Sequence, residues 1–266
     1  MIDWGEHLDA QQLDAVQHCG GPAQVIAGPG SGKTRVLTYR IAYLVAEVGL
    51  DPKQILAMTF TRKGAREMAE RLERLLGVQA KRLWTGTIHS FCYRLLRKNR
   101  GRPTVSALVA AWDGCSILNG AAKRRAWEQA VEQAGVPLKA GAAAEIVSGC
   151  RNQGVRLEQL KHIAIAEGTT DRRQERWQAA TTWEQYQKIE RALGSLDFDD
   201  LLADAAAMLT ADLYLADRLH HLFSAVLVDE AQDLNTVQWS IIRAIAPPPD
   251  SDLTVVGDVD QAIYAF

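Results

Sequence analysis

The segment that most constrains how this chain folds is a glycine-rich loop between two different hydrophobic patterns. Residues 24–27 form a short apolar run before the loop, and Leu37, Ile41 and Leu44 follow it at a helical spacing. A strand, a glycine loop and a helix in this order are typical of a phosphate-binding loop, because backbone N–H groups and the helix N-terminus point at one anion. The loop residues are Ala27, Gly28, Pro29, Gly30, Ser31, Gly32, Lys33 and Thr34.

The two polar residues that end this loop have distinct predicted roles. We expect Lys33 to bind the β- and γ-phosphates and the hydroxyl of Thr34 to bind Mg²⁺. Ala27 stands where the usual pattern begins with glycine. A glycine-rich turn that binds nothing is the alternative, and the strand and helix around the loop favour the phosphate site.

A pair of acids supplies the expected partner of the phosphate loop. The apolar run 225–228 ends in Asp229 and Glu230, so both acids are predicted at the carboxyl end of a strand, where ligands bind in open α/β sheets. Asp229 is the predicted second Mg²⁺ ligand, and Glu230 the predicted base for the attacking water. We expect the two acids to face the phosphate loop from a neighbouring strand. An acidic turn that caps a helix is the alternative.

The hydrophobic pattern predicts an α/β protein with a parallel sheet flanked by helices. Buried strands are predicted at residues 24–27, 55–60, 83–87, 225–228 and 253–256, with helical patterns between them. From residue 98 to about 191 no strand is predicted. We therefore expect an α/β domain of residues 1–98 and 192–266 that carries the phosphate loop, interrupted by an all-α subdomain of residues 99–191. The tryptophans expected to anchor the core of this insertion are Trp112, Trp127, Trp177 and Trp183.

The composition excludes some classes of site and protein but does not indicate a function. The net charge is −2, so a nucleic-acid site must be a local basic surface. The four cysteines lie far apart, which argues against a zinc site or a disulfide framework and fits a cytoplasmic protein. The first ten residues are not a signal peptide, and no run approaches the roughly 18 apolar residues of a membrane helix. No membrane partner is expected.

The loop and the acids belong to an ordered series of motifs that resembles superfamily 1 DNA helicases of the UvrD/Rep/PcrA group. The series comprises residues 8–16, 32–35, 59–65 with Met68, 85–91, 196–202, 229–233 and 257–266. Arg62, Gly64, Ala262 and Phe266 depart from the usual residues of that group. The resemblance implies a RecA-like fold, ATP and Mg²⁺ as cofactors, and single-stranded DNA and single-strand/duplex junctions as partners.

The resemblance also assigns roles to individual residues. Gln12 would contact the adenine edge, Arg35 would lie near the nucleotide, and Gln261 would sense the γ-phosphate, with Gln232 in a similar role. The residues expected to contact DNA are Phe60, Thr61, Arg62, Lys63, Thr87, His89, Tyr264 and Phe266. The aromatic rings among them would stack on bases, although packing in the core is their alternative role.

The function that follows is ATP-dependent translocation along single-stranded DNA with duplex unwinding. The resemblance implies movement from 3′ to 5′. Repair or replication proteins are expected as partners. The sequence ends within the last motif, before the second RecA-like domain of that group, so we expect the chain alone to be weakly active or inactive. A nucleotide- or DNA-binding module without turnover and a P-loop kinase of small molecules are the alternatives. The basic runs 94–102, 123–125 and 172–176 would contact duplex phosphates or form solvated faces.

Overall fold

The computed structural model describes residues 3–100, 116–166 and 170–258. This part of the chain forms two compact units. Among the described residues, the first comprises residues 3–91, 212–234 and 238–258, and the second comprises residues 92–100, 116–166, 170–211 and 235–237. The limits predicted for the insertion, residues 99–191, stay a prediction. None of the described helices has both the length and the apolar composition that a bilayer-crossing helix needs.

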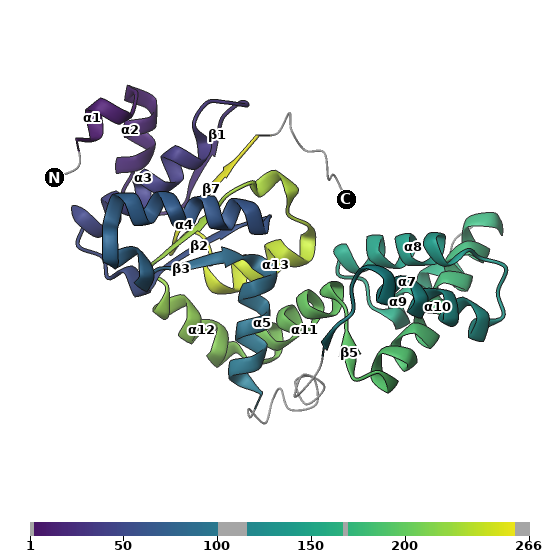
Figure 1. Cartoon of the computed structure of the whole chain (residues 1–266). Coiled ribbons are helices and arrows are strands. Elements are labelled where there is room, and N and C mark those ends of the chain that lie inside the picture. The colour runs from purple at the N-terminus through teal and green to yellow at the C-terminus, as the bar shows by residue number, and fades with distance from the viewer. Residues whose placement is uncertain (1–2, 101–115, 167–169, 259–266) are drawn as a thin grey trace. The chain divides into compact units, whose positions relative to one another are not determined.

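A five-stranded parallel sheet is the centre of the first unit (Figure 1). Its order is β1-β7-β6-β2-β3, which confirms the α/β prediction. Every predicted strand is present, and each end lies within one residue of its predicted position. The strands are β1 (Ala23–Ile26), β2 (Ile55–Thr59), β3 (Trp84–Thr87), β6 (Ala225–Val228) and β7 (Asp252–Gly257).

Helices cover both faces of this sheet. In Figure 1, α3 and α4 lie on one side, and α12 and α13 on the other. Leu37 of α3 and Met68 of α4 are fully buried against sheet residues such as Leu227. Burying one such side chain stabilises the fold by about 1.5–3 kcal/mol.

The helices that begin in this unit are α1 (Trp4–His7), α2 (Ala10–Gln17), α3 (Lys33–Ala46), α4 (Arg62–Leu76), α5 (Ile88–Asn99) and α12 (Leu213–Leu222), with the short 3-10 helices η1 (Pro52–Gln54), η2 (Gly77–Arg82) and η4 (Ala231–Asp233). Helix α13 (Thr236–Ile245) lies mainly in this unit.

Because all five strands are parallel, their carboxyl ends lie at one edge of the sheet. Ile26 at the end of β1 pairs with Gly257 of β7, and Val228 at the end of β6 pairs with Val255 of the same strand. Strand β7 therefore separates β1 from β6. The expectation that the acids lie on a strand neighbouring the phosphate loop is wrong, because the last strand of the described chain inserts between the two.

The second unit is a helical bundle with an aromatic core. Trp127 stacks on Tyr186, with ring centroids 4.1 Å apart, and Trp183 is also buried. Trp177, in contrast, is 52% exposed; it lies six residues before Trp183, which is about 240° around a helix. The prediction of core anchors is thus confirmed for Trp127 and Trp183 and wrong for Trp177, while Trp112 lies outside the described residues. The helices are α7 (Gly120–Ala134), α8 (Ala140–Asn152), α9 (Leu157–Ala166), α10 (Thr170–Ala192) and α11 (Phe198–Ala211).

This unit also holds a very short parallel pair that the sequence did not predict. Strand β4 (Ser116–Ile117) pairs with β5 (Ser195–Leu196), and the hydroxyls of Ser116 and Ser195 are 2.7 Å apart. Two residues are too few to produce an alternating pattern, so no periodic signal marks β4. The pair joins the two ends of the bundle, 79 residues apart in sequence.

A buried charged network lies beside that pair. Arg151 is 6% exposed and donates to Asp197 at 3.1 Å and to Asp200. Lys123 contacts Asp197 at 2.9 Å and Asp199 at 3.3 Å. Lys123, the first residue of the basic run 123–125, is therefore bound inside the unit, whereas Arg124 and Arg125 are exposed.

Candidate active site

The phosphate loop connects the end of β1 to the start of α3. Gly30 and Gly32 have φ of 75° and 86°, in the left-handed region that favours glycine. A Cβ on Gly32 would also lie 3.1 Å from the Nε2 atom of Gln12. Glycine at this position thus permits both the turn and the close approach of the preceding helix.

The ammonium group of Lys33 folds back onto its own loop. It donates to the carbonyl oxygens of Ala27 at 2.9 Å and Gly28 at 3.2 Å, and it lies 3.4 Å from Oδ2 of Asp258 at the end of β7. All three ammonium protons therefore have partners. These partners are neutral carbonyls and one long ion pair, which phosphate oxygens can replace.

Thr34 and Asp229 meet across the end of β7. The hydroxyl of Thr34 donates to Oδ2 of Asp229 at 3.1 Å. Asp229 is 4% exposed, and burial, followed by the charge of Glu230, raises its pKa to about 6, while the Thr34 hydrogen bond opposes the rise. A hydroxyl and a carboxylate at this spacing form the hard oxygen set that Mg²⁺ prefers.

Glu230 occupies a strained backbone position beside these residues. Its φ is 54°, the only positive φ of a non-glycine residue in the described chain, and such a conformation costs of order 1–3 kcal/mol. The N–H of Glu230 donates to Asp229 Oδ1 at 3.1 Å, and Gln232 donates from Nε2 to Glu230 Oε2 at 2.7 Å. The hydrogen bond from Gln232 holds the carboxylate of Glu230, a residue that lines the cavity described next.

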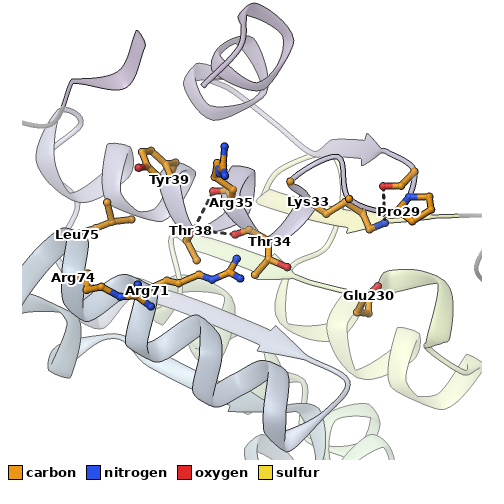
Figure 2. A pocket seen from close by; sticks show the side chains of 13 residues that line it. Pro29, Lys33, Thr34, Arg35, Thr38, Tyr39, Arg71, Arg74, Leu75 and Glu230 are labelled. Atoms are coloured by element: carbon orange, nitrogen blue, oxygen red, sulfur yellow. Dashed lines mark hydrogen bonds between the residues drawn. The ribbon is translucent and has the colours of Figure 1, made fainter. Parts of the chain in front are cut away.

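A cavity of about 660 Å³ joins the loop to the helices that flank it. Figure 2 shows Glu230 on one side of Thr34, and Arg71, which reaches from α4, on the other. Its lining residues are Gly28, Pro29, Gly30, Gly32, Lys33, Thr34, Arg35, Thr38, Tyr39, Arg71, Arg74, Leu75 and Glu230. The phosphate loop and Glu230 thus share one hollow, as the sequence predicted.

The sequence reasoning missed three charged residues of this region. Arg71 and Arg74 line the cavity from α4, and Asp258 contacts Lys33. The two arginines are three residues apart, so they share one helix face, and that spacing was the available signal. Asp258 directly follows β7, the strand next to the loop, but only the strand order reveals this proximity.

Gln12 and Arg35 both lie close to Gly32 of the loop. The amide of Gln12 donates to Ser31 O at 2.9 Å and accepts from the N–H of Asp9 at 3.2 Å, which completes a capping box on α2. Arg35 lines the cavity and lies 3.5 Å from the carbonyl of His7. Gln12 therefore binds the loop through Ser31, and its contact with adenine stays a prediction.

The predicted DNA contacts within the described residues gather at the ends of two adjacent strands. Phe60 to Lys63 follow β2, and Thr87 and His89 follow or end β3. Thr61 caps α4 by accepting the N–H of Gly64 at 2.9 Å, and Arg62 and Lys63 are exposed. Thr87 is buried and accepts from Ser90 N at 3.2 Å. Gln261, Tyr264 and Phe266 lie outside the described residues.

Comparison with known proteins assigns this arrangement to a family. Residues 8–266 match the family model described as the UvrD/REP helicase N-terminal domain. The chain belongs to the UvrD/REP helicase family. The kinase alternative is thereby set aside.

Relatives place the chain within that family. It is 38% identical over 269 residues to the ATP-dependent DNA helicase UvrD1 of Mycobacterium tuberculosis, with 97% of this chain covered. It is 34% identical over 264 residues to the ATP-dependent DNA helicase PcrA of Staphylococcus aureus, with 98% covered. The chain spans 34% of the length of each of these relatives and corresponds to their N-terminal part.

Proposed function

We propose that this chain is the ATP-binding part of a DNA helicase that hydrolyses ATP to move along single-stranded DNA and unwind duplexes. The observation that carries the proposal is the Thr34–Asp229 contact of 3.1 Å, beside a cavity that Thr34 lines together with Lys33 and Glu230. The names of the relatives supply the reaction, since both are ATP-dependent DNA helicases. Movement from 3′ to 5′ is part of the proposal on the resemblance alone.

The residues of the cavity divide the work of binding the triphosphate. Lys33 exchanges its carbonyl partners and Asp258 for β- and γ-phosphate oxygens, and loop N–H groups bind the remaining oxygens. Thr34 and Asp229 would hold Mg²⁺, which would neutralise charge on the phosphates. Arg71 and Arg74 add two positive charges along the opposite wall of the cavity.

Glu230 activates the attacking water in this mechanism. Its carboxylate accepts the water proton as the oxygen attacks the γ-phosphorus, and the bond between that phosphorus and the bridging oxygen breaks to release ADP. Phe60, Arg62 and Lys63, with Thr61, Thr87 and His89, form the proposed contacts to the DNA strand. Gln261, Tyr264 and Phe266 complete the proposed machinery.

Measurement of ATP binding and single-turnover hydrolysis tests the proposal. We expect Mg²⁺-dependent ATP binding by the chain, slow hydrolysis, and a faster rate when a separate second motor domain and single-stranded DNA are added. Glu230→Gln should keep binding and lose about 100-fold or more of the hydrolysis rate. Binding without any hydrolysis under all conditions would favour the non-catalytic module, and unchanged turnover in Glu230→Gln would remove Glu230 from this role.

A further inference from the structure

The side chain of Gln232 in η4 is engaged at both ends of its amide. Its Nε2 donates to Oε2 of Glu230 at 2.7 Å, and its Oε1 accepts the backbone N–H of Asp258 at 3.0 Å. The amide thus connects the acid after β6 to the end of β7. An amide is suited to this link because it donates to a carboxylate on one side and accepts an N–H on the other, without a charge.

The hydrogen bonds of Gln232 leave no space for a side chain at Gly257. A Cβ at residue 257 would lie 2.7 Å from Gln232 Oε1 and 3.4 Å from the backbone nitrogen of Gln232. The φ of Gly257 is not among the positive values of the chain, so its backbone conformation is open to alanine. The absence of a side chain is therefore required by the position of the Gln232 amide.

Asp258 contacts both the amide of Gln232 and the lysine of the phosphate loop, Lys33. Asp258 accepts Lys33 on its carboxylate at 3.4 Å, while its N–H donates to Gln232. Departure of Lys33 toward a triphosphate removes one partner of Asp258. Asp258 is therefore the residue at which the contact to Lys33 and the contact to Gln232, which holds Glu230, meet.

Building on the proposed function, we propose that Gln232 is a positioning residue that ties the Glu230 carboxylate to the end of β7 at Gly257 and Asp258. The link makes the orientation of Glu230 depend on the position of residues 257–258. It acts on the hydrolysis step and leaves the phosphate contacts of Lys33 and Thr34 untouched.

The first test replaces Gln232 with methionine, whose side chain is of similar length but lacks the amide. In single-turnover assays with the chain in excess over ATP, Gln232→Met should lower the hydrolysis rate about 10- to 100-fold, as loss of an orienting contact does. The dissociation constant of Mg·ATP should stay within about twofold. Gln54→Met is the matched control, since Gln54 donates to Ser224 away from the cavity, and it should retain both values.

The second test disturbs the link without touching a polar group. Gly257→Ala should slow hydrolysis to a similar extent, and the double variant with Gln232→Met should be no slower than Gln232→Met alone. Additive losses in the double variant, or a Gln232→Met variant as fast as the wild type, would overturn the proposal.

A spectroscopic measurement separates this inference from the proposed function. The side-chain amide resonances of Gln232, identified by their absence in Gln232→Met, should shift in Glu230→Ala and in Gly257→Ala. Resonances that stay in place in both variants would overturn the link, whether or not the chain hydrolyses ATP. A shift in a chain that neither binds nor hydrolyses ATP would uphold the link and reject the proposed function.

Discussion

Two regions of this molecule place buried acids beside basic side chains, and they differ in what those charges face. In the first unit, Asp229 and Glu230 lie next to Lys33 and Thr34 at a cavity of about 660 Å³. In the second unit, acids surround Arg151, which is 6% exposed. Lys33 and Glu230 of the first region face a space for a ligand, whereas the charges of the second region face each other.

The second region shows why a cluster of acids is insufficient evidence of a site. Oxygens of Glu190, Asp197 and Asp200 lie within 4.8 Å of one another, close enough to share a metal ion. Arg151 and Lys123 already supply positive charge to these acids. Burial, followed by the charges of Asp200 and Asp197, raises the pKa of Glu190 to about 10, so this acid is protonated at neutral pH. A cavity and replaceable partners distinguish the first region.

The largest expected effect on stability comes from breaking the closed network. Arg151→Met should lower the free energy of unfolding by about 3–5 kcal/mol, because it leaves buried carboxylates without their main partner. Urea unfolding measures this loss. Arg156→Met, at an exposed position, is the control and should change little. A loss for Arg151→Met as small as that of the control would mean that the two regions do not differ as described.

The next effect concerns the open region. Lys33→Ala should weaken Mg·ATP binding about 30-fold or more, because a charged contact to the phosphates is lost. Its loss of stability should be smaller than that of Arg151→Met, because water can enter the cavity that Lys33 lines. Titration with a fluorescent ATP analogue measures the affinity, with the exposed Lys53→Ala as control. Equal affinity in the Lys33 and Lys53 variants would contradict the assignment of the phosphate site.

A pH-dependent effect tests the protonated acid of the closed network. The pKa of Glu190 is higher in the folded chain than in the unfolded chain, so its stabilising contribution is complete below about pH 4.5 and is lost as the pH rises toward 10. Glu190→Gln should therefore be close to the wild type at pH 5 and gain relative stability at pH 7 and 9. Unfolding free energies of both proteins at these three pH values measure the trend. A constant difference across them would show that Glu190 is ionised in the folded state.

The smallest effect lies at the exposed start of α4. Lys63 is 84% exposed on its side chain and pairs with Glu67 at 3.7 Å, so Lys63→Ala should leave stability unchanged. It should weaken binding of single-stranded DNA and reduce the slope of log affinity against log salt by about 0.7, the value for one phosphate contact. Lys81→Ala, on an exposed pair with Glu73, is the control. An unaltered salt slope would remove Lys63 from the DNA contacts.

Much of the first unit could be predicted from short stretches of sequence. The strands were found because a buried strand requires a continuous apolar run, and β6 is buried at all four positions. The phosphate loop was found because its glycines, Lys33 and Thr34 act within one turn of chain. Trp177 was misplaced because a tryptophan by itself does not say which face of a helix is buried.

The sequence by itself determined the local elements of the site: the phosphate loop, the acids after an apolar run, and the helix that carries Thr34. Only the tertiary structure decided that β7 separates β1 from β6, that Arg71 and Arg74 reach the same cavity as Lys33, and that Gln232 bonds the end of β7. The physical reason is the separation in sequence between the residues that interact. Helix periods and strand runs are set by neighbouring residues, whereas strand order and the contacts at the sheet edge depend on pairings between segments up to 225 residues apart.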